Sequence, residues 1–258
     1  MDPAPPLPST TAAPGDLDLL LTDHHVHSTW SDDASSAPAQ NLVAARDTGL
    51  ASVRMVDHVR TSTTWVPGFL AEVAALPRVE GLEVLTGVEA TILDASGRLD
   101  VPAHLVVGRG GVDRILIADH LFPGPDGPWS TSRTLEEMAG GLSAQDALSI
   151  LVQATVRAMG RAGRGQLAHL FSLLPGIGLH ESELLDEHIA AIADAAVRTG
   201  TTVEVNEKWR CPGPRVVLAL AAAGVSLVGS TSSHRAVTVG RYSWVADAAS
   251  ATRLVGAR

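Results

Sequence analysis

Short, nearly uninterrupted runs of hydrophobic residues recur along the chain, with longer mixed segments between them. The seven runs are residues 17–27, 51–58, 82–89, 113–120, 165–170, 201–206 and 225–230. Continuous apolar runs of this length, rich in β-branched residues, are typical of parallel strands that are buried on both faces. The pattern therefore predicts seven parallel strands.

The segments between these runs have the start and stop signals of helices. Prolines stand where three of the segments begin, and glycines follow three of them directly, which are the positions that each residue prefers at helix ends. Ser143 and Asp146 have the spacing of an N-terminal capping box. We expect helices over residues 38–48, 67–76, 143–159, 183–199 and 214–223. Strands that alternate with helices predict an α/β fold, and one barrel of about 250 residues would occupy most of the 258 residues.

Two segments depart from this alternation. Residues 121–164 are long for one crossover, begin with FPGPDGPW, and are expected to hold a loop and two helices. A long insertion after a strand often forms a lid or a wall of the substrate pocket. Residues 1–17 contain many Pro and Ala residues and lack the features of a signal peptide, so we expect a flexible tail before a single domain at residues 18–258.

Charge and cysteine usage narrow the class of partner. The formal net charge is −9, from 19 Lys and Arg against 28 Asp and Glu, and an acidic surface repels nucleic-acid backbones. No apolar stretch approaches the roughly 18 residues that a membrane span requires. Cys211 is the only cysteine, so an intramolecular disulfide is impossible and a cytoplasmic location is expected. These features favour a small soluble molecule as partner and say nothing of oligomeric state.

Polar side chains gather where the predicted strands end. They are His25, His27, Asp57, His58, Glu89, Asp119, His120, His169, Glu204, Asn206 and, shortly after the last strand, His234. The carboxyl ends of parallel barrel strands meet on one face, where barrel enzymes place their active sites. Imidazole and carboxylate donors that converge there suit zinc, manganese or iron.

The position of each histidine within its segment decides whether it is a candidate ligand. Residues i and i+2 of a strand share a face, so His25 and His27 can bind one ion while His24 points the other way. His104, His180 and His188 lie in loop or helix patterns, where an ordinary hydrogen-bonded histidine is expected.

The order of these segments resembles the PHP (polymerase and histidinol phosphatase) family. Its first motif, D-x-H-x-H-S-x-x-S-D, matches residues 23–32 throughout. Shorter motifs follow in the family's order: VDH at 56–58, GVE at 87–89, His120, His169, and GSTSSH at 229–234 followed by Val239-Gly240. The resemblance spans about residues 18–242 and implies a distorted seven-stranded (βα)7 barrel of the TIM type, with the metal site at the carboxyl ends of the strands.

The resemblance also implies two or three divalent ions per chain and a phosphoesterase activity on a small phosphorylated molecule. It assigns His25, His27 and Glu89 to the first ion, together with an aspartate of the last motif. It assigns Asp32, His58 and His234 to the second ion. Glu89, bridging, would hold the third ion with His120 and His169.

The last motif departs from the family pattern at Ser232, where the family has the aspartate ligand. A neutral hydroxyl is a poor ligand and brings no charge to the site. The first ion site is therefore the doubtful one of the three.

Basic residues near the strand ends are candidates for holding a phosphate group in this acidic protein. They are Arg60, Lys208, Arg210 and Arg235. Arg60 and Arg235, with Asp57, are our candidate catalytic residues. Asp57 and Asp119 each precede a candidate ligand and can orient an imidazole or hydrogen-bond the end of a strand.

Two other functions stay open at this point. An amidohydrolase-like enzyme that cleaves C–N or C–O bonds also carries an HxH pair on its first strand, but it often uses a mid-barrel lysine and a late aspartate, and neither is evident here. A degenerate barrel that only binds a ligand would explain Ser232, but it has no need for so many buried imidazoles.

Overall fold

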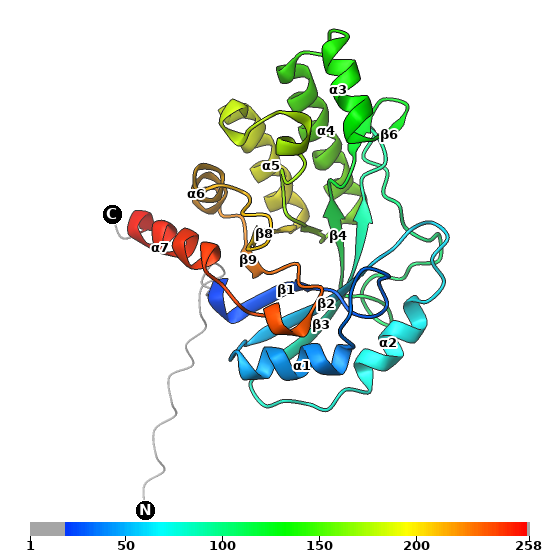
Figure 1. Ribbon diagram of the computed structural model, residues 1–258. Coiled ribbons are helices and arrows are strands. Elements are labelled where there is room, and N and C mark those ends of the chain that lie inside the picture. Colours follow the sequence, from blue (N-terminus) through cyan, green and yellow to red (C-terminus); the bar gives the residue numbers. More distant parts are fainter. Residues whose placement is uncertain (1–18, 257–258) are drawn as a thin grey trace, which may run out of the picture.

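Seven parallel strands form the barrel of this protein, as the hydrophobic pattern predicts (Figure 1). The computed structural model describes residues 19–256, so the predicted tail at 1–17 lies outside the described residues. The strands are β1 (Thr22–Val26), β2 (Ser52–His58), β3 (Glu83–Thr91), β4 (Arg114–Ala118), β7 (Gln166–Leu167), β8 (Thr202–Asn206) and β9 (Leu227–Ser230), paired in that order. A parallel bridge between Val26 and Ser233 joins the chain after β9 to β1 and nearly closes the barrel.

Helices cover the outside of this barrel. They are α1 (Pro38–Asp47), α2 (Val66–Ala74), α3 (Thr131–Ala139), α4 (Ala144–Ala162), α5 (Asp186–Thr199), α6 (Pro214–Ala222) and α7 (Trp244–Gly256). The predicted start of α4 is confirmed, because the Ser143 hydroxyl accepts a hydrogen bond from the Asp146 backbone N–H at 3.1 Å. The helix expected from residue 183 begins at Asp186, after a short 3₁₀ turn at Glu181–Glu183. Helix α7 was not predicted.

The Pro/Gly segment after β4 is a β-hairpin, and our prediction of a loop there was wrong. Strands β5 (Phe122–Gly124) and β6 (Gly127–Trp129) pair antiparallel, with Phe122 opposite Trp129. Both aromatic rings are buried in the main core and stack with centroids 5.5 Å apart. The predicted two helices, α3 and α4, follow the hairpin.

The inward-facing side chains of the strands, which are every second residue, fill the barrel interior in three layers along its axis. Val56, Leu116, Ala118 and Ala168 form a buried apolar cluster in the middle layer. Because side chains alternate along a strand, the same inward face of β2 carries Arg54 below Val56 and His58 above it. The interior is therefore polar at both ends and apolar between them.

None of the helices in residues 19–256 is both long enough and apolar enough to cross a membrane.

Candidate metal centre

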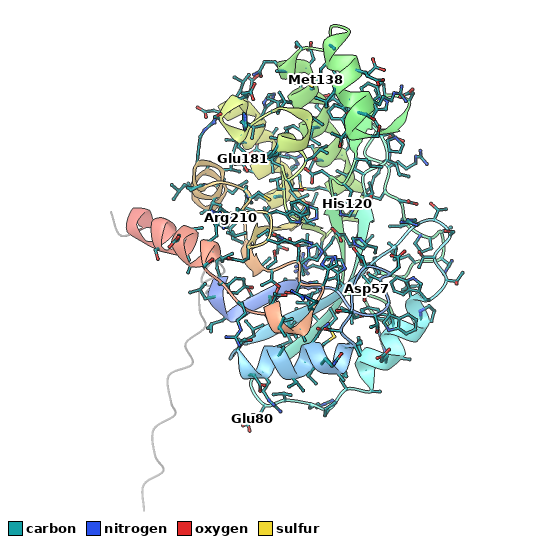
Figure 2. All side chains as sticks on the ribbon, viewed as in Figure 1. Asp57, Glu80, His120, Met138, Glu181 and Arg210 are labelled. Atoms are coloured by element: carbon teal, nitrogen blue, oxygen red, sulfur yellow. The ribbon has the colours of Figure 1, made fainter. Side chains whose placement is uncertain are left out.

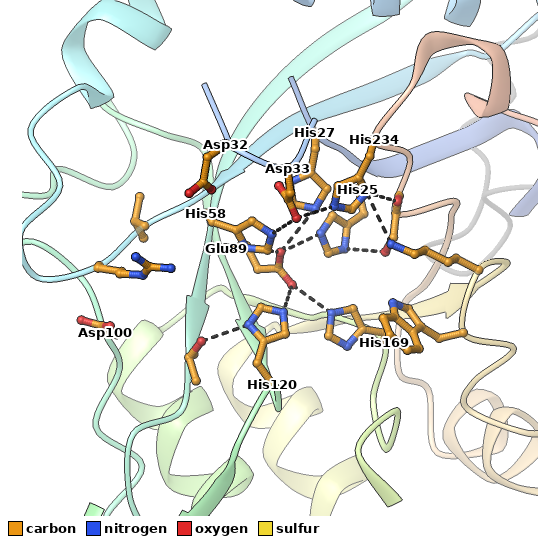
Figure 3. A pocket seen from close by; sticks show the side chains of 16 residues that line it. His25, His27, Asp32, Asp33, His58, Glu89, Asp100, His120, His169 and His234 are labelled. Carbon is orange, nitrogen blue, oxygen red and sulfur yellow. Dashed lines mark hydrogen bonds and ion pairs between the residues drawn. The ribbon is translucent and has the colours of Figure 1, made fainter. Parts of the chain in front are cut away.

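One buried carboxylate lies at the centre of the histidine cluster at the carboxyl ends of the strands (Figure 3). Glu89 on β3 has only 1% of its side chain exposed. Its Oε2 lies 3.1 Å from His25 Nε2, 3.4 Å from His27 Nε2 and 3.0 Å from His58 Nδ1. Its Oε1 lies 3.0 Å from His120 Nε2 and 2.9 Å from His169 Nε2. Five imidazoles from the ends of four strands (β1, β2, β4 and β7) therefore surround one carboxylate.

Three overlapping groups of donor atoms in this cluster are close enough to hold a metal ion. They are His27, His58 and His234; His25, Glu89 and His169; and His58, Glu89 and His120, each with its donor atoms within 4.8 Å of one another. Seven of the eight metal ligands predicted from the sequence occur in these groups. The pairing differs from the predicted sets, because His27 joins His58 and His234, and His169 joins His25.

The eighth predicted ligand, Asp32, lines the cavity, but its neighbour Asp33 makes the contacts with the histidines. Asp33 Oδ2 lies 3.1 Å from His234 Nε2 and 3.5 Å from His58 Nε2. In Figure 3 Asp32 lies further from the imidazoles than Asp33 does. The two adjacent aspartates lie in one loop but point in different directions, so the family motif, which matches at Asp32, does not reveal that Asp33 is the one that contacts the histidines.

The position of the missing aspartate contains a hydroxyl and, beside it, a different carboxylate. Ser232 Oγ lies 3.3 Å from His25 Nδ1 and accepts a hydrogen bond from the Asn206 amide at 2.8 Å. Glu204 Oε1 lies 3.0 Å from the same His25 Nδ1, and Glu204 is fully buried. Glu204 was noted at a strand end in the sequence but was given no role. The alternation of Thr202, Glu204 and Asn206 on one face of β8 is a sequence signal from which its position inside the barrel could have been inferred.

The two aspartates that precede ligand candidates act in different ways. Asp119 lies 3.5 Å from His169 Nδ1 and accepts hydrogen bonds from Phe171 N and Ser172 Oγ, so it orients that imidazole. Asp57 instead accepts hydrogen bonds from Ser28 N at 2.8 Å and from Ser31 Oγ at 2.7 Å. Asp57 does not line the cavity, and its contacts hold the loop after β1 in place.

The charges of this cluster strongly perturb its pKa values when no cation is bound. Burial favours a neutral His25, but the Glu204 and Glu89 carboxylates outweigh it and raise the pKa of His25 well above its ordinary value. Burial also opposes protonation of His169, but Asp119 and Glu89 raise its pKa to about 9. In the same way, His25 and His120 overcome burial and hold the pKa of Glu89 well below its ordinary value. The cluster is built to keep negative carboxylates beside positive charge.

The donor atoms of the cluster fit a divalent cation. His25 Nε2 and Glu89 Oε2 are buried and 3.1 Å apart, yet neither makes a hydrogen bond of acceptable geometry with any residue in the described part of the chain. Two buried polar atoms without hydrogen bonds are costly unless a cation lies between them. Imidazole nitrogen with carboxylate oxygen is the donor chemistry that zinc, manganese and iron prefer.

A cavity of about 550 Å³ opens beside the cluster. Arg60 and Lys208 line it, as predicted for cations that receive an anion, whereas Arg210 and the exposed Arg235 do not. Trp209 and Asp100, which sequence reasoning missed, complete its walls. A cavity of this volume suits a small metabolite.

Residues 121–164 contribute nothing to the lining of this cavity, and the expectation that they form its wall or lid was wrong. Phe122 and Trp129 are apolar and bury themselves in the core, which holds the hairpin against the barrel. In Figure 2 Met138 of α3 lies at the outer edge of the molecule, far from the strand ends where His120 lies.

Comparison with known proteins indicates phosphatases among the relatives. No family model matches the chain. It is 37% identical over 89 residues to a probable phosphatase of Vibrio vulnificus, an alignment that covers 32% of this chain and 34% of that protein. It is 35% identical over 93 residues to a probable phosphatase of Thermoanaerobacter sp., covering 34% of this chain and 36% of that one. The alignments thus span about a third of the length of these relatives.

The fold is similar to that of a solved phosphatase. The structure of histidinol phosphate phosphatase from Lactococcus lactis, complexed with zinc, L-histidinol and phosphate, superposes with a TM-score of 0.57. The superposition covers 91% of each chain at 13% identity. At this identity the likeness establishes a common fold.

Proposed function

We propose that the chain is a metal-dependent phosphoesterase of the PHP type that acts on a small phosphate ester. The observation that carries this proposal is the buried Glu89 carboxylate with five imidazoles around it, beside a cavity lined by Arg60 and Lys208. The similarity to probable phosphatases and the fold shared with a histidinol phosphate phosphatase support the same reaction class.

The proposed ligands are the residues predicted from the sequence, with Asp33 added beside Asp32. They are His25, His27, Asp32, Asp33, His58, Glu89, His120, His169 and His234. Zinc, manganese or iron, as two or three ions per chain, would polarise a phosphoryl oxygen and lower the pKa of a bound water. The site nearest Ser232 departs from the family pattern, and Glu204, whose Oε1 lies 3.0 Å from His25 Nδ1, is a second carboxylate beside it in addition to Glu89.

The remaining residues of the cavity bind and orient in this proposal. Lys208 and Arg60 attract the phosphate group, whose charge the acidic protein as a whole would repel. Trp209 provides an apolar wall for the alcohol part of the ester. Asp57, which the sequence suggests as a catalytic residue together with Arg60 and Arg235, is a positioning residue in this proposal, because its contacts are with Ser28 and Ser31. Arg235, exposed and outside the cavity lining, keeps only a peripheral role.

The test combines metal analysis with a substrate screen. Freshly purified protein is analysed by elemental mass spectrometry, and turnover of p-nitrophenyl phosphate and L-histidinol phosphate is then measured with added manganese or zinc. Two or three ions per chain and turnover that a chelator abolishes are the expected results. Turnover of amides or lactones without turnover of phosphate esters would reassign the site to amidohydrolase-like chemistry. Protein that takes up no metal would overturn the proposal and leave a barrel that only binds.

A further inference from the structure

A second polar cavity lies at the opposite end of the barrel, where the strands begin. It has a volume of about 520 Å³. Arg54 of β2, Arg114 at the start of β4 and Arg164 just before β7 line it, together with His24 and Thr202. This cavity shares no lining residue with the metal centre.

The three guanidinium groups of this cavity are not paired with carboxylates of the described residues, although Arg114 Nη1 donates hydrogen bonds to the backbone carbonyls of Arg164, Gly165 and Gly200 at 3.2, 2.7 and 3.3 Å. None forms an ion pair with a carboxylate within the described residues, whereas exposed arginines such as Arg133 and Arg215 do. Arg54 is 3% exposed, and its one side-chain hydrogen bond is from Nη1 to the Thr86 carbonyl at 2.8 Å. Its Nε makes no hydrogen bond to any described atom. A buried charge with so few partners is costly unless a ligand completes its hydrogen bonds.

The barrel is shaped to contain this arginine. Gly87 on β3 faces Arg54, and a Cβ added at Gly87 would lie 3.2 Å from Arg54 Cδ and 2.9 Å from Leu116 Cδ1. A side chain at position 87 would therefore displace the stem of Arg54. The apolar cluster of Val56 and Leu116 lies above, so the guanidinium is held near the lower end of the barrel.

The local charge is positive although the protein as a whole is acidic. Two exposed carboxylates, Glu83 and Asp113, also line the cavity, against three arginines. Asp113 Oδ2 accepts hydrogen bonds from Thr86 N and Oγ1, so this oxygen is already bonded to β3 and does not pair with the arginines. His24 Nε2 is hydrogen-bonded with Ser52 Oγ at 2.7 Å, and both residues form part of the cavity wall. The net positive charge favours an anion, and the rim carboxylates disfavour a polyanion.

We propose that this cavity is a binding site for a small metabolite that carries one oxyanion group, a phosphate or a carboxylate, held by Arg54, Arg114 and Arg164. Guanidinium groups are the side chains best suited to bidentate hydrogen bonds with either oxyanion. The volume suits a small molecule, and Leu85 and Val228 give it an apolar wall. The rim carboxylates would accept hydrogen bonds from a hydroxyl or amino group of the same molecule.

The test is calorimetric titration of the full-length, metal-loaded protein with inorganic phosphate and, separately, with succinate. Arg164→Gln is the main variant, because Arg164 is exposed and its side chain makes no hydrogen bond to another described residue. Arg198→Gln on α5 is the matched control, since it removes the same charge from an exposed arginine outside the cavity lining. Arg54→Gln is the second variant, used if circular dichroism shows that it folds.

Loss of one charge-assisted partner should weaken binding of the preferred probe about tenfold or more in Arg164→Gln, while Arg198→Gln binds like the wild type. The probe that loses affinity identifies phosphate or carboxylate as the group recognised. Metal content should be unchanged in every variant, which separates this site from the proposed metal centre. If Arg164→Gln and Arg198→Gln bind both probes alike, or if the wild type binds neither probe, the proposal is overturned.

Discussion

Glu89 differs from the other residues of the metal centre because it alone contacts imidazoles on both sides of the cluster. Its Oε2 faces His25, His27 and His58, and its Oε1 faces His120 and His169. Each histidine could be lost with its neighbours still in place, but loss of this carboxylate removes a ligand from two of the three donor groups at once. The dependence of the site on one residue can be tested directly.

Glu89→Gln should reduce the metal content by at least one ion per chain and lower kcat for a phosphate ester by at least about a hundredfold. The neutral amide is a poorer ligand and no longer balances the charge of the cations. Elemental mass spectrometry and steady-state kinetics measure the two effects. Glu80→Gln, at an exposed glutamate far from the site, is the control (Figure 2). Full metal loading of Glu89→Gln would contradict the bridging role.

The two aspartates after β1 provide a second test at this scale, because sequence favours Asp32 and geometry favours Asp33. Asp33→Asn should weaken binding of the metal ion near His58 and His234 about tenfold or more, since the charged neighbour of both imidazoles is lost. Asp32→Asn should have the smaller effect. Competition with a chelator measures both affinities, and the reverse order would restore the assignment made from sequence.

An element of the fold could be predicted where its sequence signal lies within the element itself, and it was missed where the signal is a contact with another segment. Strand β7 has only two residues in its ladder, yet the apolar run around it revealed its position. The β5–β6 hairpin was missed because Pro and Gly usually break strands. Gly124 is needed there, because a Cβ would lie 2.2 Å from the Trp129 ring. That contact joins residues across the hairpin, and no periodicity of the sequence encodes it.

The same limit applies to the candidate site. The histidines could be found because strand ends mark them, but the partners of those histidines depend on loop directions. Asp33, Trp209 and Asp100 lie in connections without periodicity, and their inward direction is set by packing and hydrogen bonds. Arg54 could not be distinguished from an ordinary surface arginine until its strand was placed inside a barrel.

Substitutions of two tryptophans, Trp129 in the insertion and Trp209 in the cavity wall, test whether the insertion contributes to stability or to substrate binding. Trp129→Ala should lower the free energy of unfolding by about 3–5 kcal/mol, because a buried ring is removed from the core, and should leave KM unchanged. Trp209→Ala should raise KM and leave the free energy of unfolding nearly unchanged, because Trp209 is 48% exposed and lines the cavity. Denaturant unfolding and substrate kinetics on both variants provide the comparison. If KM rises in Trp129→Ala and not in Trp209→Ala, the insertion contributes to the substrate site after all.

At the scale of the whole molecule, stability should depend on pH differently with and without metal. In the metal-free protein the pKa of His169 is about 9, against an ordinary value of 6.5. A raised pKa stabilises the folded state fully below pH 6.5, and this stabilisation is lost as pH rises through 9. The free energy of unfolding of the metal-free protein should therefore fall by up to about 3 kcal/mol between these values.

The metal-loaded protein should not show this decline, since an imidazole that binds a cation holds no proton on that nitrogen. Urea unfolding at pH 6.5 and pH 9, before and after chelation, measures the difference. Equal pH dependence of the two forms would show that His169 is not a ligand.

The bridge between Val26 and Ser233 has a consequence for how the protein matures. His25 and His27 flank Val26 of this junction, and His234 follows Ser233, so a gap of more than 200 residues must close before they meet. Contacts between such distant segments form late, since loop closure must precede them. Completion of the donor group formed by His27, His58 and His234 would then be a late event of folding, and the ion held by that group would bind only after the barrel has closed.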